Sequence, residues 1–315
     1  MKHTTLFYLV VTAFVLVGAT ACSSGDDGDE PANPTPTNPT ERKLVIGVGE
    51  NPFRDENGNA RETRGTVVTT ETLERFTMLW VDNEYAVEKK NGSWIPIPKN
   101  NQGGGWPVSG DTPISFYAHN APTNLQDNTT HPYYIFGDDH YISFSIEEAS
   151  ANQSDLLLSR VTNVTYSETK GVIWFTFDHA CAAVEFNIQI TNKLMTQLGA
   201  DLTVNSVVLK NIANTGDCHY STSSGNHIGR WENVSGNANY TLTQAYMKVD
   251  TSPVALPCKT LFIIPQTLGE SAGLEISYTF SNQTNTTAWI PLQGTEWEAG
   301  HLYPINIVLG TSLIK

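Results

Sequence analysis

The sequence predicts an all-β protein, built from two antiparallel β-sandwich domains that follow each other along the chain. After residue 40, no stretch shows a sustained helical period, whereas short alternating apolar runs bounded by Gly, Asn and Pro recur throughout. Only 16% of the residues are charged, aromatic residues reach 10%, and Thr, Asn, Ser and Gly are plentiful, as is typical of an exported β protein. Strands at such regular short spacing, with turn residues between them, favour sandwiches.

Residues 1–21 are predicted to be a secretory signal peptide. Lys2 provides a positive start, residues 6–17 are almost uninterruptedly apolar, and small residues follow. The apolar run is too short to span a bilayer comfortably. The residues before Cys22 resemble a bacterial lipobox, which predicts cleavage between Ala21 and Cys22 and acylation of Cys22. A protein anchored in this way would sit on a membrane without crossing it.

Residues 22–42 are predicted to be a disordered tether. Four acidic residues lie among Ser and Gly, and so polar a composition cannot bury enough apolar surface to fold. Residues 31–40 alternate Pro with Asn and Thr, which favours a semi-rigid, extended stalk. The acidic run resembles the export signal of many Bacteroidetes surface lipoproteins, and this resemblance implies an anchor in the outer leaflet of the outer membrane. The alternative is that the acidic run is only a spacer and carries no export signal.

The N-terminal domain is expected over residues 43–168. Its first strand is "KLVIGVG", in which Leu44, Ile46 and Val48 alternate. The polar stretch "RDENGNARETRG", which holds three arginines, follows as an exposed loop. A polar turn at residues 165–170 marks the end of the domain. Further strands are expected in "TVVTTETLERFTMLWV", "SWIPIP", "TPISFYAHN", "HYISFSI" and "DLLLSRV".

The C-terminal domain is expected over residues 169–315. It opens with the longest β signal of the chain, "GVIWFTFDHACAAVEFNIQI", in which apolar residues alternate on both sides of a break at residues 178–180. A run this long should cross the sandwich with a bulge or a corner at the break. A short helix is expected in "TNKLMTQLGA". Further strands are expected in "LTVNSVVLKNI", "TLFIIPQ", "LEISYTF", "TAWIPL" and "HLYPINIVLG".

The charge and the cysteines exclude some functions. The formal net charge is −14, and an acidic protein of this kind is not expected to bind nucleic acid, because neutralising phosphates needs clustered Lys and Arg. Beyond Cys22, the chain holds Cys181, Cys218 and Cys258, an odd number without metal-like spacing. Cys218 and Cys258 could pair in an oxidising compartment, although buried free thiols are favoured.

Motifs that could carry enzyme chemistry are explained better by structural roles. "GDDHY" gathers Asp138, Asp139 and His140, but an exposed acidic turn is favoured over a cation site because no second ligand cluster can be identified. His179 and Cys181 would share a face of an alternating strand and could form a dyad, yet a structural histidine is favoured. The glycine-rich "NQGGGWPVSG" does not open a helix, so it is not expected to cradle phosphate. We therefore expect no enzyme activity, no catalytic residue, no metal and no cofactor.

The tryptophans support a second hypothesis of another class, that of a glycan-binding surface lipoprotein. Exposed indoles on sandwich loops or faces could stack on sugar rings, although tryptophan in strands more often belongs to a core. Several tryptophans aligned on one exposed face would favour glycan capture, whereas burial of most of them would favour a structural subunit. The residues concerned are Trp80, Trp94, Trp106, Trp231, Trp289 and Trp297.

Several motifs, taken in their order along the chain, resemble the fimbrillin-like family of Bacteroidetes, which comprises fimbrial shaft, tip and anchor subunits. They are the lipobox at Cys22, "TRGT" at residues 63–66, "DLLLS" at residues 155–159, "FTFDHACAAVEFNI" and the terminal "WEAGHLYPINIVL". The resemblance covers nearly the whole chain. It implies two transthyretin-like β-sandwich domains in tandem, behind the lipoprotein signal and the stalk.

The resemblance also implies a mechanism of assembly. A sandwich that lacks one strand has an apolar groove flanked by unpaired backbone groups, which an extended segment of another subunit can fill. In shaft subunits the protein's own first strand plugs the groove until a surface arginine-directed protease releases it. Here the plug would be residues 44–48, and the candidate cleavage sites, in order of preference, are Arg64, Arg61 and Arg54.

The expected function is that of a structural component of a cell-surface fimbria, which supports cell adhesion and biofilm formation. Few residues follow the last expected strand, so a tip or accessory subunit, which accepts a strand without donating one, is favoured over a shaft subunit or an anchor. The implied partners are other fimbrial subunits, outer-membrane lipid through acylated Cys22, and ligands on host or bacterial surfaces. The alternative remains the glycan-binding lipoprotein.

Overall fold

In the computed structural model, the described part of the chain runs from residue 44 to residue 311. The gaps within it are residues 62–67, 70, 81–82, 99–105, 107–110, 122–132, 137–138, 199–201, 221–228, 244, 259 and 281–284. Ala21, Cys22 and Arg64 therefore lie outside the described residues, as does the tether. Of the helices that are described, none is long and apolar enough to cross a membrane.

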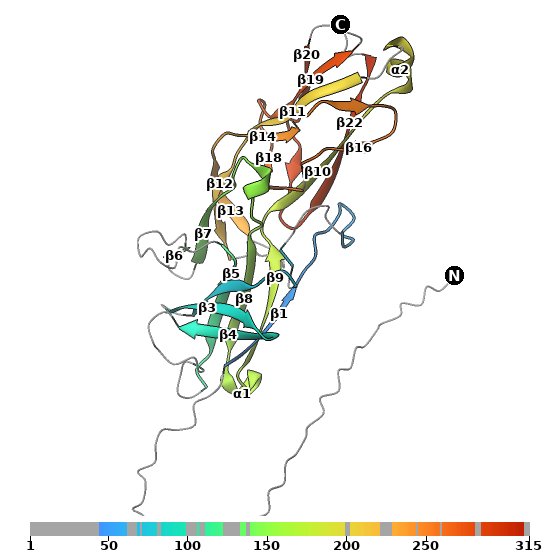
Figure 1. The fold of residues 1–315 in the computed structure, drawn as a ribbon. Helices are drawn as coiled ribbons and strands as arrows, with labels where there is room; N and C mark the ends of the chain where they lie inside the picture. Colours follow the sequence, from blue (N-terminus) through green and yellow to red (C-terminus); the bar gives the residue numbers. More distant parts are fainter. Residues whose placement is uncertain are drawn as a thin grey trace, which may run out of the picture. The chain divides into compact units, whose positions relative to one another are not determined.

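Strands dominate the described chain, which confirms the all-β prediction (Figure 1). Up to the middle of the chain they are β1 (Val45–Glu50), β2 (Arg75–Trp80), β3 (Asn83–Lys90), β4 (Ser93–Pro98), β5 (Ile114–His119), β6 (Tyr133–Phe136), β7 (Asp139–Ser145), β8 (Leu157–Val164) and β9 (Val172–His179). The later ones are β10 (Ala182–Ile190), β11 (Leu202–Ile212), β12 (Thr215–His219), β13 (Arg230–Ser235), β14 (Ala238–Thr243), β15 (Met247–Val249), β16 (Val254–Ala255), β17 (Leu261–Ile263), β18 (Gln266–Thr267), β19 (Gly273–Phe280), β20 (Thr286–Pro291), β21 (Glu296–Trp297) and β22 (Leu302–Leu309).

The short helical segments that are described are η1 (Ser150–Asn152), α1 (Tyr166–Thr169) and α2 (Asn192–Leu198). Helix α2 lies within "TNKLMTQLGA", as predicted. Helix α1 occupies the stretch expected only as a polar turn, because Thr165 and Glu168 form a capping box in which each side chain accepts the other residue's backbone N–H. Lys170 ends the helix in the left-handed conformation, at φ 54°, and directs the chain into β9.

The first sheet is a closed barrel in the order β1-β4-β3-β2-β5-β8-β9, where the sequence analysis expected a sandwich. Its pairings are antiparallel, except that β1 runs parallel to β9. The barrel closes because β1 contacts β9 along one edge and β4 along the other. Its interior is an aromatic-rich core that includes Phe76, Met78, Phe116, Phe175 and Phe177.

The later strands form smaller sheets around a second core. Strand β10 pairs with β16, β17 and β22, the sheet β14-β11-β19-β20 also holds β15, and β13-β12-β7-β6 and β18-β21 complete the described sheets. The second core includes Val184, Phe186, Val207, Leu209 and Tyr278. Strand β7 precedes residue 168 yet pairs with β12. The domain boundary between residues 168 and 169 and the transthyretin-like character of both domains stay predictions.

The long β signal forms β9 and β10, which are separated only by Ala180 and Cys181 close to the predicted break. Strand β1 runs parallel to β9, and the C-terminal strand β22 runs parallel to β10. Between them, Arg54 and His301 form a parallel bridge, with backbone hydrogen bonds from Arg54 to Gly300 and from Leu302 to Arg54. The chain after β1 therefore reaches from one core to the other.

Candidate functional site: the first strand and its surroundings

Strand β1 is held mainly by one neighbour. It pairs with β9 along its whole length, from Val45 opposite Val172 to Glu50 opposite Phe177, and backbone bonds from Val45 to Gly171 and from Asn51 to Phe177 extend this ladder. With β4 it forms a single residue pair among the described residues, Ile46 opposite Trp94. The barrel is thus closed on the β9 side and only loosely joined on the β4 side.

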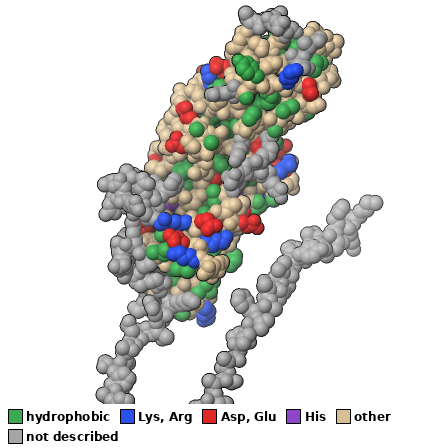
Figure 2. Space-filling view, viewed as in Figure 1, with side chains coloured by type: hydrophobic (Ala, Val, Ile, Leu, Met, Phe, Trp, Pro, Cys, Tyr) green, Lys and Arg blue, Asp and Glu red, His purple; other side chains and the backbone are tan. Residues whose placement is uncertain are grey.

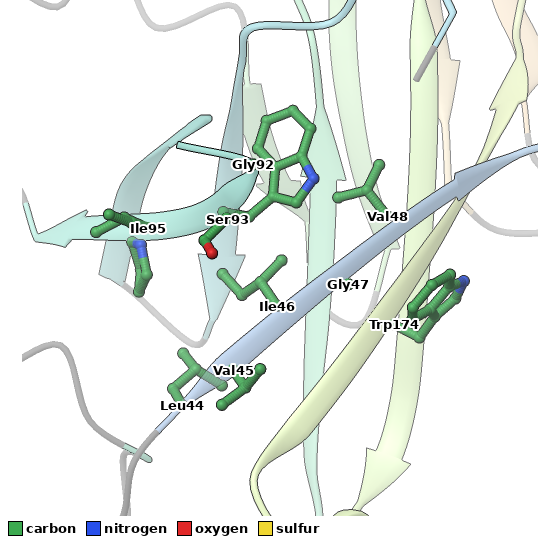
Figure 3. A pocket seen from close by; sticks show the side chains of 11 residues that line it. Leu44, Val45, Ile46, Gly47, Val48, Gly92, Ser93, Ile95 and Trp174 are labelled. Carbon is green, nitrogen blue, oxygen red and sulfur yellow. The ribbon is translucent and has the colours of Figure 1, made fainter. Parts of the chain in front are cut away.

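The three residues predicted to form a plug lie on the inner side of this strand. Leu44 and Ile46 are buried in the aromatic-rich core, and Val48 is partly buried against it. Figure 3 shows Ile46 and Val48 on the same side of β1. Apolar side chains that alternate on a strand in this way fill a groove between its two neighbours.

A groove with a volume of about 660 Å³ lies between β1 and β4. Residues 44–48 line one side, residues 92–96 line the other, and Trp174 also contributes. Figure 3 shows these side chains around β1. The groove marks the place where the backbones of β1 and β4 diverge, so the ladder between them is incomplete.

The outer side of β1 is covered by a single large residue, Trp174 of β9, which lies directly opposite Gly47. A Cβ atom on Gly47 would lie 2.1 Å from Cε3 of the indole ring, and one on Gly49 would lie 3.2 Å from its Nε1. Trp174 is 61% exposed, and in Figure 3 it lies on the side of β1 opposite Ile46. The sequence analysis missed this residue, although its position between the inward Ile173 and Phe175 placed it on the outer face.

The segment after β1 inserts Phe53 into the second core. Phe53 is buried and stacks on the imidazole of His179, with ring centroids 3.9 Å apart. Nδ1 of His179 lies 2.5 Å from Oδ2 of Asp155, and both side chains are buried. Burial raises the pKa of Asp155. The charge of His179 and its hydrogen bond to Asp155 act to lower this pKa and offset part of the effect of burial.

This buried pair joins two motifs that are distant in the sequence. Asp155 opens "DLLLS", and His179 lies in "FTFDHACAAVEFNI". The pair gives each of the two buried side chains a polar partner, as a structural role for His179 requires. Burial also raises the pKa of the Cys181 thiol, which disfavours its thiolate form.

Two of the three candidate cleavage arginines lie in a compact loop, residues 54–61. Arg54 Nη1 donates to the backbone oxygen of Gly58, and Arg54 also bridges Ala60. Arg61 Nε lies 3.4 Å from Oδ2 of Asp55, whose Oδ1 accepts backbone N–H groups of Asn57 and Asn59. The loop is closed by its own side chains, and Arg64 follows it in the sequence.

The remaining candidates are the acidic turn and the cysteines. The described residues hold no group of three or more His, Cys, Asp or Glu side chains that could bind a metal. Asp138 lies outside the described residues, and His140 stacks on Tyr117 with ring centroids 3.9 Å apart. Cys218 is a free, buried thiol, so it does not form a disulfide with Cys258 in this structure.

Most of the tryptophans considered for glycan binding are not exposed. Trp80, Trp106 and Trp297 are buried, and Trp94 and Trp231 are half-buried. Trp289, on β20, is 43% exposed, but it covers Gly273 of the neighbouring strand β19. By the criterion set from the sequence, this distribution favours a structural subunit.

The surface shown in Figure 2 carries charges of both signs. On this face, Lys and Arg side chains lie among Asp and Glu, and hydrophobic side chains are scattered among polar ones. Several basic residues are paired with acids, as in Lys210 with Glu275 and Arg230 with Glu232. This face therefore presents no continuous basic surface for a nucleic acid.

Comparisons with known proteins give a family match and several similar solved structures. A family model described as fimbrillin-like matches residues 58–315, so that β1 precedes the matched region. A candidate cell adhesion protein from Parabacteroides distasonis has a TM-score of 0.55 at 7% identity, over 86% of this chain and 89% of that chain. A fimbrial protein from Bacteroides vulgatus has a TM-score of 0.48 at 16% identity, over 87% and 96%. A candidate cell adhesion protein from Bacteroides ovatus has a TM-score of 0.48 at 15% identity, over 84% and 92%. No curated protein matches the chain.

Proposed function

Since the chain belongs to the fimbrillin-like family, we propose that it is a structural subunit of a cell-surface fimbria, at the tip or as an accessory component. In this proposal it is assembled by strand exchange and supports cell adhesion and biofilm formation. Its partners are other fimbrial subunits, and ligands on host or bacterial surfaces are the targets of adhesion.

The observation that carries the proposal is the pairing of β1. This strand is parallel to β9 in an otherwise antiparallel barrel, it meets β4 at a single recorded pair, and it buries Leu44 and Ile46. If β1 left, the edge of β9 would lose its hydrogen-bond partners and the aromatic-rich core would open. An extended segment from another subunit could restore both the ladder and the apolar contacts.

Release of β1 requires a cut in the chain that follows it. Arg54 and Arg61 are restrained by the loop of residues 54–61, and Arg54 is also bonded to the start of β22. A protease binds its substrate in an extended conformation, which these contacts oppose. We therefore place the first cleavage at Arg64, ahead of Arg61 and Arg54.

A terminal position in the fibre is supported by the C-terminal strand. Strand β22 pairs with β10 over eight positions, and Leu302, Ile307 and Leu309 are buried in the second core. Because β22 belongs to this core and no proposed cleavage releases it, we expect it to stay in the molecule and not to be donated. The protein would therefore accept a strand from a neighbour without offering β22 in return.

The route to the cell surface rests on the N-terminal sequence. Acylated Cys22 would hold the newly exported protein in the outer membrane, and the tether would keep the folded part away from the lipid. Cleavage at Arg64 would remove the anchor, the tether and β1 together. Loss of palmitate labelling in a Cys22→Ser variant would test the anchor directly.

N-terminal sequencing of the assembled protein tests the proposal. High-molecular-weight material from expressing cells should contain this chain beginning immediately after an arginine between residues 54 and 64. Arg54→Lys, Arg61→Lys and Arg64→Lys together keep the charge and should prevent both processing and assembly. Arg75→Lys, in β2, is the matched control and should change neither. A monomeric protein that always begins at acylated Cys22 would contradict the proposal and leave an anchor or a glycan binder.

A further inference from the structure

The strand that occupies the groove shows what a replacement must look like. Arg54, Arg61 and Arg64 all follow Phe53 in the sequence, so a cut at any of them vacates the same positions, from Leu44 to Phe53. We call the space left by these residues the acceptor groove. This inference rests on the proposed function, because it assumes that β1 is exchanged for a strand of another chain.

In the middle of the acceptor groove, any side chain on the outer side of the strand would displace Trp174. Trp174 lies flat against Gly47, where an added Cβ atom would be 2.1 Å from the indole ring, a distance that real contacts do not show. Gly49 lies against the other end of the same indole, at 3.2 Å from Nε1. A residue larger than glycine opposite Trp174 therefore forces the indole away from the strand. A cross-strand aromatic residue that covers a glycine stabilises such a pair.

A tryptophan also covers a glycine of the neighbouring strand elsewhere in the described sheets. Trp289 of β20 covers Gly273 of β19, with a Cβ-to-ring distance of 2.4 Å, and Trp231 of β13 covers Gly216 of β12, at 3.0 Å. In both cases the two strands are neighbours that stay in the molecule. Trp174 is different because its glycine partner lies on the strand that the proposed cleavage would release.

At the end of the acceptor groove, the position of Phe53 favours an aromatic side chain. Phe53 fills a position between His179, at a centroid distance of 3.9 Å, and Phe262, at 6.3 Å. Its removal would uncover the buried pair of His179 and Asp155. A donor strand that stops short of this position, or carries a small residue there, would leave these polar groups poorly shielded.

We propose that the acceptor groove selects one kind of partner, an extended strand of another subunit with three features. It carries apolar residues at the inward positions of Leu44 and Ile46, glycine at the outward positions of Gly47 and Gly49, and an aromatic residue at the position of Phe53. Contact with Trp174 favours the glycines, and stacking on the His179 ring favours the aromatic residue. Strands with β-branched or long side chains at the positions of Gly47 and Gly49 bind more weakly.

Peptide exchange into the cleaved protein tests this selection. The full chain is cut by an arginine-specific protease and incubated with an excess of a fluorescent peptide that copies residues 43–55, and binding is followed by anisotropy and gel filtration. A peptide with Gly47→Val should bind at least about tenfold more weakly, because of overpacking against the indole. Peptides with Gly49→Val or Phe53→Ala should also bind more weakly. A Val45→Ile peptide is the matched control, because Val45 is exposed on the same outer side of β1 but away from Trp174, and it should bind like the parent peptide.

A substitution in the protein completes the test. In a Trp174→Ala protein the parent and Gly47→Val peptides should bind within about threefold of each other, because the coupling between the two positions has been removed. In a Trp289→Ala protein the tenfold preference for glycine should persist. Folding of the protein does not limit the main comparison, since the decisive substitutions are in the peptide.

The outcomes separate this inference from the proposed function. If neither the parent peptide nor any variant binds, strand exchange at this groove is wrong, and the proposed function falls with it. If all peptides bind equally well, exchange is supported but selection by Trp174 and His179 is wrong. If the preference for Gly47 persists in the Trp174→Ala protein, the glycine is required for a reason other than the indole, and the inference is overturned.

Discussion

Replacing Phe53 by alanine should lower the free energy of unfolding of the uncut protein by about 3–5 kcal/mol. The side chain is only 2% exposed, so nearly its whole apolar surface is withdrawn from water. Stacking on His179 adds to this burial, and such aromatic contacts contribute about 0.5–1.5 kcal/mol beyond it. The cavity cannot collapse easily, because the next residue, Arg54, is hydrogen-bonded through its backbone to Gly300 and Leu302. We therefore expect a value of about 4 kcal/mol.

The measurement is urea-induced unfolding of the uncut protein and of the same protein after arginine-specific cleavage and removal of the N-terminal fragment. Phe177→Ala is the matched control: Phe177 is fully buried, packs edge-on against Phe76 and lies on β9, which stays in the protein. Both variants should be destabilised before cleavage. After removal of the fragment, the Phe53→Ala protein should be as stable as the wild type, whereas Phe177→Ala should remain destabilised.

Two results would refute this reasoning. A loss below about 1 kcal/mol in the uncut Phe53→Ala protein would mean that the segment after β1 does not anchor in the second core, since a buried phenylalanine cannot be removed at so small a cost. A destabilisation that persists after cleavage and separation would mean that the segment holding Phe53 does not leave the protein. The second result would also remove the physical basis for strand exchange.

Three further predictions test other parts of the structure. Asp155→Leu should cost about 3–5 kcal/mol, because it leaves His179 buried without its partner, whereas adding His179→Phe should recover much of the loss; urea titration that shows no recovery would contradict this. Burial lowers the pKa of His119 to about 3 from an ordinary value of 6.5, so between these pH values the unfolded chain binds this proton and the folded chain does not. Stability should therefore fall with decreasing pH by up to about 1.4 kcal/mol per unit from this residue, and His119→Leu should flatten the decline between pH 7 and pH 5; equal slopes in both proteins would be the contrary result. Thr165→Ala removes the cap of α1 and should cost about 1 kcal/mol, seen as a lower urea midpoint, while an unchanged midpoint would show that the cap contributes nothing.

Strand positions could be predicted from local alternation, whereas strand partners could not. The alternation of Leu44, Ile46 and Val48 identified β1, and the long apolar run identified β9 and β10 with a break between them. Nothing in that pattern shows that β1 pairs in parallel with a strand more than a hundred residues later, because parallel pairing depends on how the intervening chain folds. The closed barrel follows from this distant pairing, and the sandwich expected from strand spacing alone is not confirmed for this sheet.

In the candidate site, too, the positions of residues could be predicted from the sequence, whereas their contacts could not. The inward residues of β1 could be found from periodicity, but the role of Trp174 depends on its register opposite Gly47. Asp155 and His179 were both visible in quoted motifs, yet the sequence gives no sign that "DLLLS" and "FTFDHACAAVEFNI" meet through these two side chains. Helix α1 could have been found, because Thr165 followed by Glu168 is a capping-box pattern.

If strands are exchanged as proposed, the arrangement of β1 and β22 makes β1 the one that can be replaced. Strand β1 runs parallel to β9 over six positions, and β22 runs parallel to β10 over eight. The segment after β1 and the residue before β22 meet at the bridge between Arg54 and His301. Their hydrogen-bond geometry is therefore equivalent, and geometry alone does not distinguish a plug from a permanent strand. The difference lies in connectivity: a cut between residues 54 and 64 separates β1 from the barrel, whereas β22 remains continuous with the sheet that precedes it. If β1 left together with Arg54, Leu302 would lose its hydrogen bond to Arg54, and the start of β22 would then depend on the strand that replaced β1. A donor that reaches this position would complete the barrel and the junction between the two cores at once.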